Sequence, residues 1–84
     1  MNQLKIDYDL NKTYFKYNIL PNKVPTIFIH GVGLDNSMWF PQKKYFKDQS
    51  ILFYDILNHG KSAKGYKKLN FNLFANQLLD LIDN

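Results

Sequence analysis

Residues 51–62, ILFYDILNHGKS, decide how this chain can fold. The apolar run at 51–54 is typical of a short buried strand, and Asp55 ends it. Gly-Lys-Ser at 60–62 is also how a phosphate-binding loop ends. Such a loop needs a glycine five positions before Gly60, where this chain has Asp55, and it should open directly onto a helix. The stretch therefore does not predict a nucleotide site.

A second stretch, TIFIHGVGLDNSMW at residues 26–39, also begins with a short strand pattern. The pattern is followed by a glycine-rich loop at residues 30–36, called the glycine loop below. The run at 26–29 favours a central strand of a parallel sheet, buried on both faces. Gly31-Val32-Gly33 begins a dinucleotide fingerprint, but the third glycine would fall at position 36, which is Asn36. A lone Gly-x-Gly is weak, so the loop does not predict a dinucleotide site either.

The flanking segments add a hairpin and two helices. Polarity alternates over residues 4–10 and 13–19, which predicts two strands, the first half-buried, joined at Asn11-Lys12. Ser37 could cap a helix over about 38–46, with Pro41 tolerated in its first turn. Asn70 is expected to cap a last helix. The apolar face of that helix is predicted to hold Phe71, Phe74, Ala75, Leu78, Leu79 and Ile82.

The order of these elements indicates the α/β class. Strand, helix and strand over residues 26–54 form a βαβ unit, so its two strands should be parallel. An N-terminal β-hairpin precedes this unit, and a further helix follows it. The expected segments are the hairpin 4–19, the strand, loop and helix 26–47, the strand and turn 50–62, and the helix 70–84.

Composition narrows the possible functions. The 84 residues contain no cysteine and two histidines, so no metal site is expected. The formal charge is +4, carried by lysine without arginine, and the lysines at 61–68 favour a solvated loop over a nucleic-acid site. No apolar run is long enough for a membrane span, and the first residues lack the apolar core of a signal peptide. We expect a soluble, cytoplasmic protein that binds neither membranes nor nucleic acids.

Together, the two stretches resemble the α/β-hydrolase family. TIFIHGVGLDNSMW is similar to a strand followed by the oxyanion loop and a helix that opens with tryptophan, here Trp39. LFYDILNHGKS is similar to the next strand and its Asp-x-x-Gly-His-Gly-x-Ser turn. The matching residues of that turn are Asp55, His59, Gly60 and Ser62. The resemblance covers almost the whole chain, but Leu57 and Asn58 stand where the family often has arginine and glycine.

The resemblance implies a set of roles in an intact relative, which would hydrolyse a small carboxylic ester or a similar bond without metal or organic cofactor. The backbone N–H of Val32 would help to form the oxyanion hole, in a substrate loop with Gly31, Gly33 and Leu34. His30 would orient that loop. Trp39, Asp55, His59, Gly60 and Ser62 would be structural. A blander alternative is that the two loop glycines only make the strand-to-helix turn.

The family's nucleophile lies in a Gly-x-Ser-x-Gly elbow, after the equivalent of the 70–84 helix. The acid and the catalytic histidine come later still. None of the three serines of this chain has the elbow pattern. A triad of Ser62, a histidine and Asp55 can be drawn, but any loop with these residue types allows it. We therefore expect an N-terminal part that is inactive alone; whether it is a gene fragment or one half of a split enzyme, with a second chain that carries the rest of the domain, stays open. The alternative is a non-catalytic remnant or interaction module.

Overall fold

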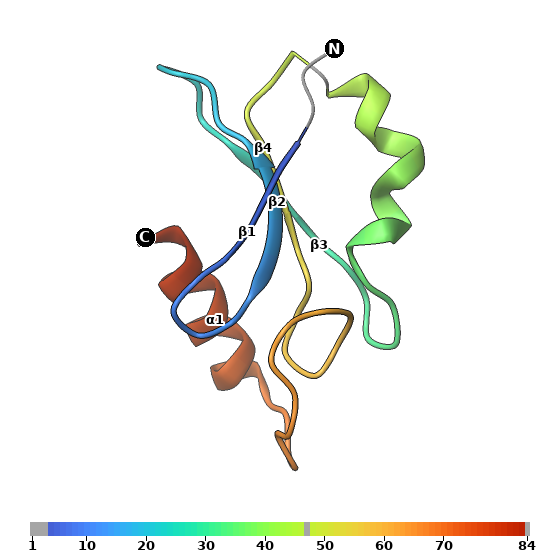
Figure 1. The fold of residues 1–84 in the computed structure, drawn as a ribbon, viewed down its shortest axis with the longest axis vertical. Helices are drawn as coiled ribbons and strands as arrows, with labels where there is room; N and C mark the ends of the chain where they lie inside the picture. The colour runs from blue at the N-terminus through green and yellow to red at the C-terminus, as the bar shows by residue number, and fades with distance from the viewer. Residues whose placement is uncertain (1–3, 47, 84) are drawn as a thin grey trace.

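The protein folds as a four-stranded sheet between two helices (Figure 1). The computed structural model describes residues 4–46 and 48–83. Along the chain the elements are β1 (Lys5–Tyr8), β2 (Tyr14–Asn18), β3 (Thr26–Ile29), the 3₁₀ helix η1 (Asn36–Tyr45), β4 (Ile51–Tyr54) and α1 (Phe71–Ile82). The strand order in the sheet is β1-β2-β4-β3. The α/β class, the hairpin and the parallel β3–β4 pair are confirmed.

The apolar alternation of β4 places a hydrophobic cluster on each face of the sheet. Ile51 and Phe53 pack with Phe28 on the side of η1, where Trp39 and Phe46 join them. On the other side, Tyr54 packs with Leu81 of α1. Successive side chains of a strand point to opposite faces, so one short strand can anchor both layers. The buried strand expected at residues 51–54 is therefore confirmed.

Within the described residues β3 is an edge strand, the position expected for it when the nucleophile strand of an intact relative is absent. β4 lies between β2 and β3, so β3 forms one edge of the sheet. Phe28 is buried, but Ile29 is 49% exposed. The apolar run predicted the strand and its bounds correctly. It could not tell whether a neighbour lies on one side of the strand or on both.

The half-buried character predicted for the first strand is wrong. All four residues of β1 are exposed, because β1 lies at the other edge and pairs with β2 alone. The positive φ of the hairpin turn occurs at Lys12 (φ 61°). The Asp9 carboxylate holds this turn by accepting hydrogen bonds from the N–H groups of Asn11 and Thr13, both at 2.9 Å.

The helix expected at residues 38–46 starts earlier and has a tighter form. Asp35, not Ser37, is the N-cap, because its carboxylate accepts a 2.8 Å hydrogen bond from the Ser37 N–H. Pro41 therefore lies in the middle of η1, where it has no N–H to donate. Residue 47, the last of the predicted segment, lies outside the described residues.

The last helix begins as predicted, with Asn70 accepting a 2.9 Å hydrogen bond from the Leu73 N–H. Its buried face differs from the prediction. Phe74 and Leu78 do pack against the sheet, together with Leu81. The other four residues predicted for that face, Phe71, Ala75, Leu79 and Ile82, are exposed. The predicted end at residue 84 lies outside the described residues. Within them, no helix has the length and hydrophobicity to cross a membrane.

Candidate functional site

The candidate site is built around Asp55, the first residue after β4. Its side chain is almost fully buried. Oδ1 accepts hydrogen bonds of 2.7 Å from both the backbone N–H and the side-chain amide of Asn36, and Oδ2 accepts one of 2.9 Å from the Lys61 N–H. A buried carboxylate is costly unless it is hydrogen-bonded, and these donors meet that need. Asp55 thus joins the start of η1 to the 56–62 turn.

Two residues of this turn need the left-handed backbone region. Gly60 has φ +51°, and a Cβ built there would lie 2.2 Å from Asp55 Oδ2. Only a glycine lets the turn close over the carboxylate. Asn58 has φ +64°, so asparagine does adopt the conformation expected of it in the place of glycine.

The two histidines fasten the glycine loop to the same turn. Ile56 N–H donates a 2.9 Å hydrogen bond to His30 Nε2, and Gly33 N–H donates one of 2.8 Å to His59 Nε2. Each Nδ1 lies 2.8 Å from a carbonyl oxygen, that of Gly31 for His30 and that of Leu57 for His59. Since each Nε2 accepts, each ring is neutral and carries its proton on Nδ1.

The glycine loop is left open by this arrangement. Val32, at its tip, is 79% exposed. Among the described residues, no acceptor is recorded for its N–H, whereas the Leu34 N–H donates to the Gly31 carbonyl at 3.1 Å. Gly33 has φ +88° and no atom within 4 Å of a built Cβ. Gly31 is not among the residues with positive φ. Only Gly33 therefore needs the conformational freedom of glycine in this loop.

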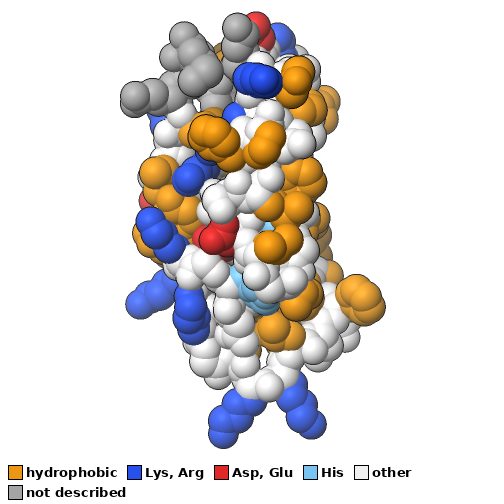
Figure 2. All heavy atoms as spheres, turned by 90° about the vertical axis from the view of Figure 1, so that its right-hand side faces the viewer, with side chains coloured by type: hydrophobic (Ala, Val, Ile, Leu, Met, Phe, Trp, Pro, Cys, Tyr) orange, Lys and Arg blue, Asp and Glu red, His pale blue; other side chains and the backbone are white. Residues whose placement is uncertain are grey.

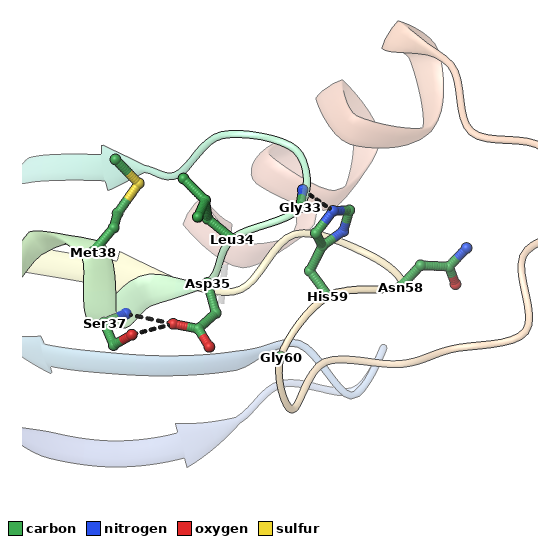
Figure 3. Close-up of a pocket in the computed structure, with 8 residues that line it drawn as sticks. All are labelled: Gly33, Leu34, Asp35, Ser37, Met38, Asn58, His59 and Gly60. Atoms are coloured by element: carbon green, nitrogen blue, oxygen red, sulfur yellow. Dashed lines mark hydrogen bonds between the residues drawn. The ribbon is translucent and has the colours of Figure 1, made fainter.

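A cavity of about 590 Å³ lies between the glycine loop and the 58–60 turn, open to solvent (Figure 3). Gly33 and His59 face each other across their hydrogen bond, and Asp35 bonds to Ser37 on the other side. The pKa of Asp35 is lowered, first by the Ser37 hydroxyl and then by the Ser37 N–H. The lining residues are Gly33, Leu34, Asp35, Ser37, Met38, Asn58, His59 and Gly60.

Comparisons with known proteins agree with this geometry. A crystal structure of a hydrolase from Pseudomonas aeruginosa superposes on 95% of this chain with a TM-score of 0.73 and 19% identity. The chain carries the fold of the first part of an α/β-hydrolase. A curated relative, (E)-2-((N-methylformamido)methylene)succinate hydrolase from Acinetobacter baylyi, is 40% identical over 40 residues, 46% of this chain. No family model matches the sequence.

The matched part is small in both hydrolases. The chain spans 31% of the Pseudomonas structure and 15% of the Acinetobacter protein. In the α/β-hydrolase fold shared with the first, the glycine loop and the 55–62 turn both follow parallel strands at their carboxyl ends. Ligand sites of α/β sheets form at such ends. The structure therefore brings His30, Gly31, Gly33, Asp55, His59 and Gly60 into one region, as the sequence indicated.

Ser62 and Trp39 lie away from this cavity. Ser62 is buried; its hydroxyl accepts a 2.9 Å hydrogen bond from the Tyr14 N–H and donates to the Asp55 carbonyl. Trp39 packs against Phe28 with ring centroids 5.2 Å apart. Its Nε1 is buried and has no partner among the described residues. Neither side chain is placed to act on a ligand in the cavity.

Sequence reasoning missed Gln77, a buried amide on α1. Its Nε2 donates hydrogen bonds to Thr13 Oγ1 at 3.1 Å and to the Asp55 carbonyl at 3.0 Å, and its Oε1 accepts one from the Leu57 N–H at 3.0 Å. The side chain of Leu57 is buried. At this position, where the family often has an arginine, the turn is held by the neutral amide of Gln77 through the Leu57 N–H. The only signal available was a polar residue one turn before Leu81. Among the described residues, no three potential metal-ligand side chains gather.

Proposed function

We propose that this chain is the first part of a serine hydrolase of carboxylic esters or similar bonds. In this proposal the Val32 N–H is one donor of the oxyanion hole. The observation that carries it is the exposed loop tip, whose N–H has no acceptor among the described residues. A donor that is fixed before the reaction and aimed at developing charge is the main contribution of such a hole.

The surroundings of Val32 support this role. His59 accepts a hydrogen bond from the N–H of the next residue, Gly33. His30, where the loop begins, accepts one from the Ile56 N–H and so ties the end of β3 to the turn. Both rings bond to the backbone through both nitrogens, so neither is left free to act as a general base. They act as positioning residues that keep the donor in place. A loop fixed at both ends loses little further freedom when it meets a charged intermediate.

In the proposed enzyme the nucleophile comes from elsewhere. The hydroxyls of Ser37, Ser50 and Ser62 donate to Asp35, the Leu20 carbonyl and the Asp55 carbonyl, respectively. The 84 residues hold no Gly-x-Ser-x-Gly. The rest of the hydrolase domain would supply the serine, histidine and acid. Both similar proteins are named as hydrolases, which supports hydrolysis as the class of reaction. The serine nucleophile and the ester substrate come from the family resemblance of the sequence.

The test is a chimera in which residues 4–83 replace the matched segment of the Pseudomonas hydrolase. We expect saturable hydrolysis of p-nitrophenyl acetate. Val32→Pro, which removes the N–H, should lower kcat by about 10²–10³-fold, the usual effect of losing one oxyanion donor. Val32→Ala keeps the N–H and is the matched control.

Two results would contradict the proposal. Equal kcat values for the proline and alanine variants would show that the Val32 N–H does not contribute to catalysis. A folded chimera without turnover would favour a non-catalytic remnant. The 84-residue chain alone should show no saturable activity, and activity abolished by Ser62→Ala would show that Ser62 is a nucleophile after all.

A further inference from the structure

Of the two histidines, His59 is the one in contact with the open cavity. It is half-buried and lines the cavity beside the glycine loop, whereas His30 is 4% exposed. The two rings lie next to each other, with centroids 5.4 Å apart. Histidine is the side chain that ordinarily changes charge between pH 5 and pH 8. A change of pH therefore reaches His59 through the cavity without any opening of the fold.

The hydrogen bond between Gly33 and His59 requires a neutral ring. The Gly33 N–H donates to Nε2 at 2.8 Å, while Nδ1 lies 2.8 Å from the Leu57 carbonyl oxygen and uses its proton there. In an imidazolium ion both nitrogens carry a proton, and neither can accept. Nε2–H would then face the Gly33 N–H, two donors with no acceptor between them. This bond is therefore lost when His59 becomes charged.

Asp35 supplies an acceptor for the charged ring. Its carboxylate lines the same cavity as His59 (Figure 3). Both bonds recorded for that carboxylate among the described residues use Oδ1 and come from Ser37, which leaves Oδ2 to accept. The Ser37 hydroxyl and N–H lower the pKa of Asp35, so it stays ionised over the pH range in which histidine changes charge. A nearby anion favours the charged form of a histidine.

The other charged groups around His59 are already bonded or lie outside the cavity lining. The Asp55 carboxylate is held by Asn36 and the Lys61 N–H, and the Lys64 ammonium group donates to the Gly60 carbonyl. From α1, the turn is contacted by Gln77, which has no charge. The titratable groups on the surrounding elements are His30, Asp35, Asp55, Lys61, Lys64 and Tyr66.

We infer that His59 is a pH switch that fastens the glycine loop when neutral and releases it when charged. Above the range of histidine titration the ring holds the Gly33 N–H. As the pH falls through that range, the imidazolium ion bonds to Asp35 instead, and Gly33 loses its acceptor. The start of the loop stays attached, because His30 is buried and keeps its bond to the Ile56 N–H. The inference rests on these bonds and holds whether or not Val32 belongs to an oxyanion hole.

The test is NMR spectroscopy of the full 84-residue chain, labelled with ¹⁵N, between pH 7.5 and pH 5. At pH 7.5 we expect the ring of His59 to carry its proton on Nδ1 alone. At pH 5 the Gly33 amide proton should move upfield, and its protection against exchange, corrected for the intrinsic rate, should fall about tenfold. That factor corresponds to the loss of one hydrogen bond. The ring signals and the Gly33 amide should change with the same midpoint.

His59→Gln is the decisive variant, because the glutamine amide oxygen can accept from Gly33 but does not titrate. The Gly33 signals of this variant should be the same at pH 7.5 and pH 5. Asp35→Asn keeps a good helix cap and removes the anion, so Gly33 should respond only at lower pH than in the wild type. Asp48→Asn, on an exposed residue outside the cavity lining, is the matched control and should leave the midpoint unchanged.

Four results would overturn the inference. A proton on Nε2 of His59 at pH 7.5 would show that the ring does not accept from Gly33. No response of the Gly33 amide in the wild type would remove the switch. A response that survives in His59→Gln would assign it to another group. Equal midpoints for Asp35→Asn and Asp48→Asn would show that Asp35 does not receive the charged ring.

Discussion

Asp55 is bonded through its backbone and both carboxylate oxygens. Its N–H donates to the Tyr14 carbonyl at 3.0 Å, and its carbonyl accepts from Ser62 and Gln77. With Asn36 and Lys61 on the carboxylate, this one residue connects β2, η1, the turn and α1. Removing any of these partners would leave a buried polar group unsatisfied, which usually costs about 1–3 kcal/mol.

Gly60→Ala tests the fit between the turn and Asp55. The added methyl group would meet the carboxylate at 2.2 Å, so the turn must move in addition to bearing the left-handed strain of about 1–2 kcal/mol. Gly65→Ala is the matched control, because Gly65 has φ +100° with no atom within 4 Å of a built Cβ. Urea unfolding should give a larger loss for Gly60→Ala than for Gly65→Ala. Equal losses would mean that strain alone requires a glycine at position 60.

Gln77→Leu tests the buried amide. The change removes hydrogen-bonding partners from Thr13, Leu57 and Asp55 together. We expect a loss of at least about 2 kcal/mol in the free energy of unfolding, since each unsatisfied buried group costs about 1–3 kcal/mol. Asn76→Leu, at an exposed position of the same helix, should change it by less than about 0.5 kcal/mol. Similar values for the two variants would show that Gln77 contributes no more than a surface residue.

At the scale of elements, α1 buries a narrower stripe than its composition suggests. Leu81 is 5% exposed, whereas Leu79 is 56% exposed and Phe71 is 92% exposed. The exposed residues Phe71, Ala75, Leu79 and Ile82 form a second apolar stripe on the outer side of the helix. The helix thus has one apolar stripe against the sheet and another facing solvent.

Leu81→Ala and Leu79→Ala separate the two stripes of α1. Leu81→Ala should lower the free energy of unfolding by about 2–5 kcal/mol, the usual effect of emptying a buried leucine site. Leu79→Ala should change it by less than about 1 kcal/mol, because the side chain is already half in water. Chemical denaturation of both variants measures the difference. A larger loss for Leu79→Ala than for Leu81→Ala would mean that the buried face of α1 is the one predicted from the sequence pattern.

The sequence predicted the bounds of strands best where an apolar run is short and ends at a polar or loop residue. The bounds of β3 and β4 were predicted because each run ends at a polar or loop residue, His30 or Asp55. The buried face of α1 was missed because hydrogen bonds, not hydrophobicity, bury Gln77. The start of η1 was missed because two neighbouring residues, Asp35 and Ser37, are both good caps.

The candidate site was predictable as a set of residues but not as a bonding pattern. Family resemblance pointed to His30, His59 and Asp55. The sequence alone could not show that both rings accept backbone N–H groups, because such bonds depend on where two distant loops meet. The role of Asn58 was the exception, since its positive φ follows from a local backbone preference.

Across the whole molecule, the two edges of the sheet differ. The β1 edge carries Lys5 and Asp7, charges that protect an edge strand from pairing with other chains. The β3 edge has no charged residue between Thr26 and Ile29. Figure 2, turned to face the side of η1 and the glycine loop, shows hydrophobic side chains spread along it with lysines at the lower end. We expect the uncharged β3 edge and these exposed hydrophobic side chains to promote association.

Thermal unfolding at several protein concentrations tests this expectation. We expect broad or concentration-dependent transitions for the 84-residue chain, because an uncharged edge strand and wet apolar side chains promote association. A second chain beginning at a nucleophile-elbow strand should restore cooperative unfolding. A sharp, reversible transition that is independent of concentration would show that the chain is stable by itself, and the proposed partner chain would not be needed.

The hydrogen bond between Gln77 and Thr13 joins residues 64 positions apart. When a ribosome makes this chain, the hairpin and all four strands emerge before the helix that carries Gln77. Thr13 and the Asp55 carbonyl therefore lack this donor until residue 77 has been made. Contacts over such long separations are also slow to form in refolding, because a large loop must close first. The turn beside the candidate site is thus expected to become fixed only after α1 has formed and docked on the sheet.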